Sequence, residues 1–506
     1  MRSLIAGSAA LPLVFAGAPA SAQDAGNEVW IGQTGNTNTI VIVQEGEGNR
    51  AGADNVRFLM NQDGDFNVLS IDQFGWNNHG GRTEVGEDRP SGINQVGDRN
   101  EILVEQITTE PSGSNEIGAV YQQSSRLSGS PANLARIRQS EDGAATLGAG
   151  HFLGSVRQIN DSENGAANEA TIEQSGGGVG LSHSIASVSQ SGTGNTLDIW
   201  QTDQSNAMKA IVQRGEGNFL HSEQGNGQDN LVEFTEQFGA LNSMKIRQSG
   251  SRNVIQQALQ NNEILETGTG NRIDVAMTGE DNGGDGRGGV GEFLATATLG
   301  LSGVAQGVFL QMGDDNDLAL TIVQGALSKF GFTQIGDGNG IVSAISEALG
   351  QAAYRNEVGV FQQGDDNYIA HSAIGSDNVL AVTQVGGRNL ADVQQTGQFH
   401  TTMLRIDGYD TNSASAGGFS GDGLTGAAGA GLSPGTIVQK GTLHSVSLVV
   451  GGSRNLFGVS QTGDTHRIDS TMSGSNNQFV AVQTGIGNTS LSQQYGSGNG
   501  LLVRQY

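Results

Sequence analysis

The sequence predicts an all-β solenoid in which strand-turn-strand repeats stack into a cross-β, amyloid-like column. Three observations support this prediction: a six-residue motif that recurs along the chain, alternation of apolar and polar residues between the motifs, and runs of motifs at intervals of 11 residues. Alternation with a period of two indicates strands, and glycine-containing turns at short, regular spacing indicate that the strands are short. Periodicity, rather than overall hydrophobicity, therefore predicts the fold class.

The first 22 residues have the features of an export signal. Arg2 gives a positive start, residues 4–18 are apolar or small, and Ala20-Ser21-Ala22 is an A-x-A cleavage signature before Gln23. An uncleaved membrane anchor is the alternative, but the stretch is short for a spanning helix. We therefore predict a signal peptide at residues 1–22 and a secreted mature chain.

The motif that follows is glutamine, any residue, glycine, any two residues, asparagine. Its full copies begin at Gln33, Gln44, Gln62, Gln73, Gln95, Gln190, Gln213, Gln237, Gln248, Gln311, Gln334, Gln362, Gln384, Gln483 and Gln494. Their glycines are Gly35, Gly46, Gly64, Gly75, Gly97, Gly192, Gly215, Gly239, Gly250, Gly313, Gly336, Gly364, Gly386, Gly485 and Gly496. Their asparagines are Asn38, Asn49, Asn67, Asn78, Asn100, Asn195, Asn218, Asn242, Asn253, Asn316, Asn339, Asn367, Asn389, Asn488 and Asn499.

Degenerate copies keep the spacing while changing the residue. Glutamine is replaced by Glu266, Ala373, Val450 or Met472, and asparagine by His400 or His466. The last stretch shows the register most clearly, because intervals of 11 residues separate Val450, Gln461, Met472, Gln483 and Gln494.

Residues between the motifs alternate between two sides. In Asn67-Val68-Leu69-Ser70-Ile71-Asp72-Gln73, asparagine, two apolar residues and glutamine take every second position. A period of two is that of a β-strand, so these four residues should face one side while polar residues such as Glu173 and Lys245 face the other. Each repeat is therefore predicted to be one half-buried strand.

Glutamine and asparagine can face inward only if their amides are paired. Each amide carries donors and an acceptor, so identical amides in strands about 4.7–4.8 Å apart can hydrogen-bond to their copies. We therefore predict a structural amide ladder formed by the motif glutamines and asparagines. The same pairing favours an ordered solenoid over disorder, the other interpretation of a composition rich in Asn, Gln and Gly.

The motif glycines are predicted to be turn glycines, since turn sequences such as Asp337-Gly338-Asn339 permit positive φ. Strand, turn, strand and turn then form one closed layer of about 22 residues, and about 17 to 20 such layers fit the chain once the interruptions are discounted.

Composition excludes several other classes of protein. Glycine occurs 80 times but proline only 6 times, which excludes a collagen-like chain. A formal net charge of −26 argues against nucleic acid or an anionic membrane as partner and favours solubility of the single chain before assembly. Without cysteine, neither disulfides nor thiolate metal sites can hold the fold together.

Strand alternation fails at residues 278–307 and 407–435, and more weakly near residues 141–150. These breaks are interpreted as flexible loops on one edge of the solenoid, with recognition or anchoring loops as the alternative. The predicted organisation is a repeat solenoid at 23–277, a loop insertion at 278–307, repeats at 308–406, a Gly/Ser-rich loop insertion at 407–435 and C-terminal repeats at 436–506.

The repeat resembles that of the curlin family, the subunits of bacterial curli amyloid fibres, whose repeats share the Gln-x-Gly-x-x-Asn core, alternating apolar residues and a following glutamine. The similarity covers most of residues 28–506, and the end of the chain at residues 499–506 is similar to a curlin terminus that stops just after its last glutamine. This chain is far longer than a typical curlin and its rows are interrupted, so its role as major subunit, nucleator or divergent relative stays open.

Because catalytic signatures and metal-ligand patterns are absent from the sequence, we predict a structural protein rather than an enzyme, without metal or cofactor. The resemblance implies export through the periplasm and an outer-membrane curli channel, nucleation on a partner curlin subunit, and homopolymerisation into a cell-surface-attached extracellular fibre of the biofilm matrix that serves surface adhesion. A polymer would grow because the open ends of a solenoid leave backbone groups unpaired.

Two other functions stay open. A monomeric surface adhesin or calcium-binding β-roll would use acidic turns such as Asp314-Asp315 and Asp365-Asp366, which offer oxygen ligands but do not follow the nonapeptide pattern of calcium β-rolls. A polysaccharide-active β-helix enzyme is less favoured, because the sequence lacks the HExxH, GxSxG and phosphate-loop signatures. The three tryptophans and the two histidines at asparagine positions are interpreted as packing, turn or ladder residues: Trp30, Trp76, Trp200, His400 and His466.

Overall fold

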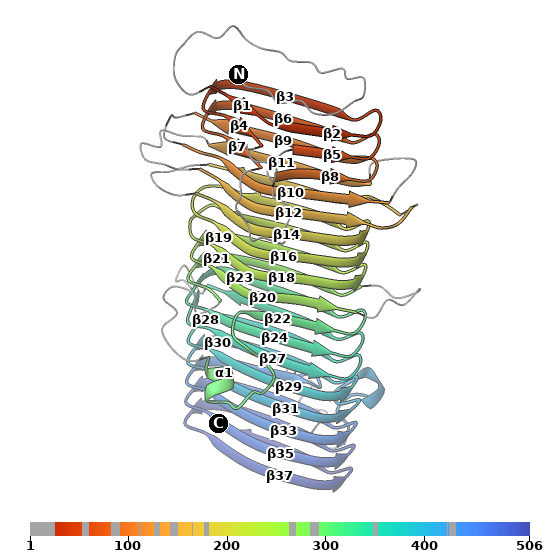
Figure 1. The fold of residues 1–506 in the computed structure, drawn as a ribbon. Coiled ribbons are helices and arrows are strands. Elements are labelled where there is room, and N and C mark those ends of the chain that lie inside the picture. Colours follow the sequence, from red (N-terminus) through yellow and green to blue (C-terminus); the bar gives the residue numbers. More distant parts are fainter. Residues whose placement is uncertain are drawn as a thin grey trace. The chain divides into compact units, whose positions relative to one another are not determined.

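The structure is a computed structural model, and the part of the chain that it describes is nearly all β (Figure 1). The chain divides into two compact units, residues 1–251 and residues 252–506. The predicted signal peptide and Glu266 lie outside the described residues. Those residues are 26–52, 60–81, 92–109, 111, 113–125, 132–141, 150–163, 165–176, 182–262, 270–283, 293–347, 353–421, 424 and 432–506.

The first unit contains strands of two parallel sheets, here called sheet A and sheet B, and the chain passes from one to the other at each turn. Sheet A strands are β1 (Glu28–Val29), β2 (Ile31–Thr34), β4 (Arg50–Ala51), β5 (Met60–Asp63), β7 (His79–Gly80), β8 (Gly92–Val96), β10 (Glu116–Ser124), β12 (Phe152–Asn160), β14 (Ser184–Thr193), β16 (Ala207–Glu216) and β18 (Leu231–Ala240). Sheet B strands are β3 (Thr39–Glu47), β6 (Val68–Trp76), β9 (Asn100–Thr108), β11 (Asn133–Glu141), β13 (Asn168–Ser175), β15 (Thr196–Gln201), β17 (Phe219–Gly225) and β19 (Ser243–Ser251).

The second unit repeats this arrangement and adds a short helix, α1 (Leu294–Ala297), and a 3-10 turn, η1 (Ala414–Ala416). Its sheet A strands are β20 (Val254–Asn261), β22 (Val308–Met312), β24 (Lys329–Ile335), β27 (Glu357–Gln363), β29 (Val379–Gly387), β31 (Thr401–Tyr409), β33 (Ser445–Ser453), β35 (Arg467–Ser475) and β37 (Thr489–Ser497). Its sheet B strands are β21 (Arg272–Glu280), β23 (Asp317–Ala326), β25 (Gly340–Ser346), β26 (Ala353–Tyr354), β28 (Tyr368–Ser376), β30 (Leu390–Gln398), β32 (Thr436–Thr442), β34 (Leu456–Asp464), β36 (Gln478–Ile486) and β38 (Gly500–Gln505).

The core lies between the two sheets of each unit and follows the predicted alternation. In β6, Leu69, Ile71 and Gln73 are buried, while Ser70 and Asp72 face outward and are only partly buried. Burial of each aliphatic side chain contributes about 1.5–3 kcal/mol, so a core spread over many thin layers stabilises the stack. The predicted class, an all-β solenoid of stacked strands, is confirmed.

Turns of successive layers lie in direct contact. Gly192 in β14 pairs in register with Gly215 in β16, and its φ is 101°. A Cβ on Gly192 would overlap the carbonyl oxygen of Gly215. Glycine is therefore required for two reasons: a φ that other residues avoid, as predicted, and close approach of the next layer.

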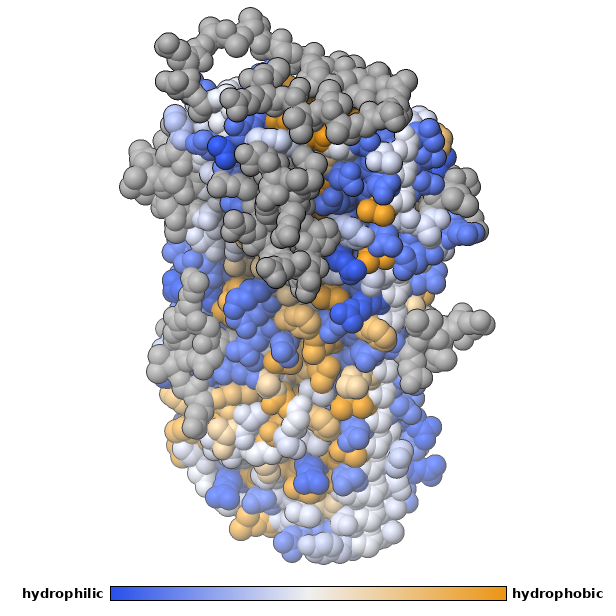
Figure 2. Space-filling view, in the orientation of Figure 1, coloured by the Kyte–Doolittle hydropathy of each residue, from blue (hydrophilic) through white to orange (hydrophobic). Residues whose placement is uncertain are grey.

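The first predicted insertion differs from the expected loop in both extent and packing. Strand β21 continues to Glu280, so Thr278 belongs to the sheet. After the break, Phe293 and Leu301 flank α1 and pack with Ala295 against Ala381 on the outer face of sheet A. Figure 2 shows apolar side chains gathered in this region. The described part, residues 293–307, is a packed strap rather than a bulging loop, because it buries its own apolar side chains.

The second predicted insertion is corrected in the same way. Strand β31 runs to Tyr409, beyond the predicted boundary at residue 407. Leu424 and Leu432 then pack against Val480 of β36, with Phe419 beside them. The weaker break begins where β11 ends at Glu141, and residues 142–149 lie outside the described part.

Across the described ranges, no helix is long and apolar enough to span a bilayer.

Candidate assembly site

Motif glutamines of successive layers form a continuous chain of amide hydrogen bonds. Nε2 of Gln190 donates to Oε1 of Gln213 at 2.8 Å, and Nε2 of Gln213 donates to Oε1 of Gln237 at 2.8 Å. Nε2 of Gln190 also donates to the backbone carbonyl of Glu169 at 2.9 Å. These amides are fully buried, so the ladder removes the cost of burying them. The structure thus brings these three predicted ladder glutamines together, whereas the predicted ladder residue Gln494 stacks in register on Met472.

Glutamines outside the full motif complete the rows. Nε2 of Gln95 donates to Gln122 at 3.0 Å, Gln122 donates to Gln158 at 2.8 Å, and Gln158 donates to Gln190 at 2.7 Å. The strict motif misses them because no glycine follows two residues later. The alternation before the glutamine would have found them. Other ladder glutamines without that glycine are Gln106, Gln139, Gln201, Gln224, Gln260 and Gln505. Four more have the glycine but lack the asparagine five residues on: Gln174, Gln395, Gln439 and Gln461.

Motif asparagines form a second ladder that also supports the turns. Nδ2 of Asn218 donates to Oδ1 of Asn195 at 3.0 Å, and the backbone N–H of Asn218 donates to the same oxygen at 3.2 Å. Nδ2 of Asn218 also donates to the carbonyl oxygen of Gly239 at 3.0 Å, in the next turn. Each asparagine therefore links three successive layers and satisfies backbone groups that the turn leaves free.

Apolar residues replace glutamine in parts of the second unit. In sheet A, Ile406, Val450 and Met472 stack in register and are completely buried. Ala373 occupies the equivalent place in sheet B, between Ile345 and Gln395. Degenerate motifs thus keep the layer in place by apolar contact instead of amide pairing.

The first and last layers expose unfinished ladders. Among the described strands, β2 pairs only with β5 and β3 only with β6. At the other end of the chain, β37 pairs only with β35 and β38 only with β36. Three apolar side chains of the last layers are largely exposed: Leu491 at 71%, Tyr495 at 64% and Tyr506 at 85%. These layers carry unpaired strand edges, the feature by which β-structures associate.

Carboxylates of the acidic turns hold the turn of the preceding layer. The backbone N–H of Asp314 donates to Oδ1 of Asp337 at 2.8 Å, and that of Asp337 donates to Oδ1 of Asp365 at 3.0 Å. Within the described ranges, no group of three or more His, Cys, Asp or Glu side chains is placed to hold a metal ion. These carboxylates therefore support the backbone of the turns.

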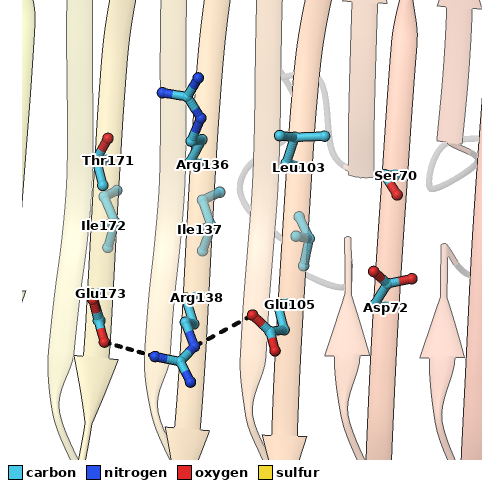
Figure 3. Close-up of a pocket in the computed structure, with 11 residues that line it drawn as sticks. Ser70, Asp72, Leu103, Glu105, Arg136, Ile137, Arg138, Thr171, Ile172 and Glu173 are labelled. Carbon is cyan, nitrogen blue, oxygen red and sulfur yellow. Dashed lines mark hydrogen bonds and ion pairs between the residues drawn. The ribbon is translucent and has the colours of Figure 1, made fainter.

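A shallow groove lies on the outer face of sheet B in the first unit, over β6, β9, β11 and β13 (Figure 3). Arg138 lies between two carboxylates, with Nε 3.3 Å from Glu105 and Nη1 2.9 Å from Glu173. Burial raises the pKa of the neighbouring Asp72 carboxyl. The groove is therefore lined by a cross-strand ion-pair ladder, which stabilises the sheet by about 0–1 kcal/mol per exposed pair.

Trp200 lies further along the same outer face and is 45% exposed, in edge contact with His221. Its predicted packing role is therefore confined to the surface of the sheet.

Comparison with protein-family models, with curated proteins and with solved structures found no match.

Proposed function

We propose that this chain is a secreted structural subunit that assembles end to end into curli-like amyloid fibres for biofilm matrix and surface adhesion. The observation that carries the proposal is the pair of unfinished ladders at the first and last layers. Each internal layer receives hydrogen bonds from one neighbour and gives them to the other, so a second copy can supply the partner that each terminal layer lacks.

The two ends have matching spacing. If Gln494 of one copy lies over Gln33 of the next, then Gln505 lies over Gln44 without insertion or deletion. Asn499 then lies over Asn38 in the same register. Amide therefore meets amide at every rung of the new layer, as it does within the chain.

Apolar residues match in this register as well. Leu501 and Val503 of β38 would face Ile40 and Ile42 of β3, all on the inner side of sheet B. Leu501, Val503 and Ile42 are partly exposed in the single copy, and their burial supplies a hydrophobic driving force for addition of a copy.

The ladders also give the fibre a direction. Internal glutamines donate from Nε2 toward the layer that follows in the chain, as Gln483 donates to Gln505 at 2.7 Å. The last layer would therefore donate to Gln33 and Gln44 of the next copy. Growth joins the C-terminal layer of one copy to the N-terminal layer of another.

The partners and location follow from the family resemblance rather than from these contacts. We propose homopolymerisation, nucleation on a curlin-type partner subunit, and export through the periplasm and an outer-membrane channel to a cell-surface-attached fibre. The net charge of −26 would keep single copies apart during transit.

The test uses the mature chain, residues 23–506, and follows growth on preformed seeds by thioflavin fluorescence. In Gly496→Ala the new Cβ points toward the place where Gly35 of the next copy would lie, because a Cβ on Gly474, the equivalent glycine of the preceding layer in sheet A, would meet the carbonyl oxygen of Gly496 in the same way. Within one copy only the side chain of Asn499 lies nearby, at 3.7 Å. We expect this variant to fold but not to extend seeds.

Gly498→Ala is the control, since a Cβ there meets nothing within 4 Å in the single copy. Between layers, a Cβ at the equivalent Gly338 comes closest to the side chain of Asp366 rather than to its backbone, so the neighbour can shift. This control should extend seeds like the wild type. The proposal fails if the wild-type chain never extends seeds, or if both variants extend them equally. Calcium-dependent folding without fibre growth would instead favour the monomeric adhesin or β-roll, and turnover of a polysaccharide would favour the enzyme.

A further inference from the structure

Histidine replaces asparagine in two stretches of the asparagine ladder. In the first unit, His151 and His183 stack with ring centroids 5.0 Å apart. In the second unit, His400, His444 and His466 form a stack of three, with centroids 4.9 and 5.0 Å apart. All five side chains are buried, at the corner where the chain passes from sheet B to sheet A.

Three of the rings, His183, His444 and His466, reproduce the hydrogen bonds of the asparagine that they replace. The ring of His400 keeps the Nε2 contact, 3.0 Å from the carbonyl oxygen of Thr396. The backbone N–H of His466 donates to Nδ1 of His444 at 3.3 Å, and that of Asn488 donates to Nδ1 of His466 at 3.2 Å. Nε2 of His444 lies 2.9 Å from the carbonyl oxygen of Lys440, four residues earlier. Nδ1 thus takes the place of the asparagine oxygen, and Nε2–H takes the place of the asparagine amide.

This geometry requires the neutral ring with its proton on Nε2. A proton on Nδ1 would point at a backbone N–H, so one hydrogen bond would become a contact between two donors. It would also place positive charges on rings about 5 Å apart, where they repel. Asparagine in the same position does not take up a proton in this pH range.

We propose that the histidine stacks are proton-sensitive rungs, which open in acid while the neighbouring asparagine rungs hold. The inference depends on the fold and not on the proposed function.

The charged surroundings of the rings support this behaviour. Around His444, Asp464 favours the protonated ring, whereas burial and the neighbouring His466 oppose it. Lys440 is exposed and contributes its carbonyl oxygen, and Arg467 is exposed and pairs outward with Asp469 at 3.7 Å.

Burial has the largest effect on these rings. It lowers the pKa of His400 to about 4, and it also lowers the pKa of His444. In the first unit, burial and His151 lower the pKa of His183 to about 4, against a weaker opposing effect of Asp203.

The test replaces the stack of three by the residue native to the ladder, in the full mature chain: His400→Asn, His444→Asn and His466→Asn together. Backbone hydrogen exchange in β31, β33 and β35 is compared with the wild type at the same pH, at pH 7 and pH 4. The pKa of His400 is about 4 in the folded chain and about 6.5 once the rung has opened, so acid favours the open form. At pH 4 the opening equilibrium of the wild type should therefore be at least about 100-fold larger than that of the triple variant. His221→Asn, on the outer surface, should leave the pH dependence unchanged.

Equal pH dependence in the wild type and the triple variant would overturn the proposal. Nitrogen NMR of the wild-type imidazoles gives a second readout if the triple variant does not fold. We expect unprotonated Nδ1 and protonated Nε2 on His444 and His466 at pH 7, and no charging of His400 above about pH 5. A proton on Nδ1 of His444 or His466, or titration of His400 near pH 6.5, would equally overturn it.

Discussion

The carbonyl oxygen of Gly496 occupies the space that a Cβ on Gly474 would need, because the turns of successive layers lie in contact. The same carbon on Gly496 would meet only the amide of Asn499, at 3.7 Å. The two glycines share a positive φ, 119° and 101°. The two positions differ in whether a following layer lies against them. Alanine variants at the two positions therefore separate the cost of backbone strain from the cost of a clash between layers.

We expect Gly474→Ala to destabilise the single copy more than Gly496→Ala does. Both variants bear a strained φ, which costs of order 1–3 kcal/mol. Gly474→Ala must in addition push the last layer away. Hydrogen exchange in β35 and β37, measured on unassembled protein, checks the difference, and equal exchange in the two variants would contradict it.

Replacement of an internal ladder glutamine should weaken its layer. Gln213→Leu leaves Oε1 of Gln237 without the donor at 2.8 Å, and loss of one partner of a buried pair costs about 1–3 kcal/mol. Arg214→Gln, on the exposed side of the same strand, should cost less than about 0.5 kcal/mol. Denaturant unfolding followed by exchange in β16 tests this, and similar losses in the two variants would argue against the ladder.

Acid should also act on a histidine inside the core. His371 lies in the column of Leu320, Ser343 and Val393, with its Nδ1 2.9 Å from Ser343 Oγ, and burial lowers its pKa to about 4. Because the pKa of His371 is lower in the folded chain than in the unfolded chain, its contribution to the free energy of unfolding is complete above pH 6.5. That contribution falls by up to about 3 kcal/mol as the pH drops toward 4.

The double variant Ser343→Val with His371→Val should therefore unfold less readily in acid than the wild type. At pH 7 it should be close to neutral, because both polar partners are removed together. Thermal unfolding at pH 7 and pH 4 measures the difference, which must be larger at pH 4 for the prediction to stand.

The strap at residues 293–307 covers a buried ion pair. Lys329 Nζ lies 3.3 Å from Glu357 Oε1, and the N–H of Leu294 donates to Glu357 Oε2 at 2.6 Å. Burial raises the pKa of Glu357, and Lys329 opposes this. Lys329→Met should destabilise the strap by about 3–5 kcal/mol, since it leaves a buried carboxylate without its cation.

Adding Glu357→Gln to Lys329→Met should recover part of that loss, because the unpaired charge is removed. Proteolysis at the strap gives the comparison. A double variant cleaved faster than the single one would show that the ion pair does not hold the strap.

Much of the fold was predictable because the solenoid repeats one local rule. The alternation in residues 67–73 places Leu69, Ile71 and Gln73 inside, as the structure does. Local patterns could not predict the straps, since Leu424 and Val480 are far apart in the sequence and become neighbours only when the sheet is formed.

The sequence by itself determined the period, the inward set of side chains and the turn glycines, because each depends on residues within one strand and its turn. Only the tertiary structure decided how layers pair: Gln158 without a following glycine donates to Gln190, and His466 replaces an asparagine atom for atom. Gln158 and Gln190 are 32 positions apart and His466 and Asn488 are 22 apart, so the geometry of these two pairings exists only after the layers have stacked.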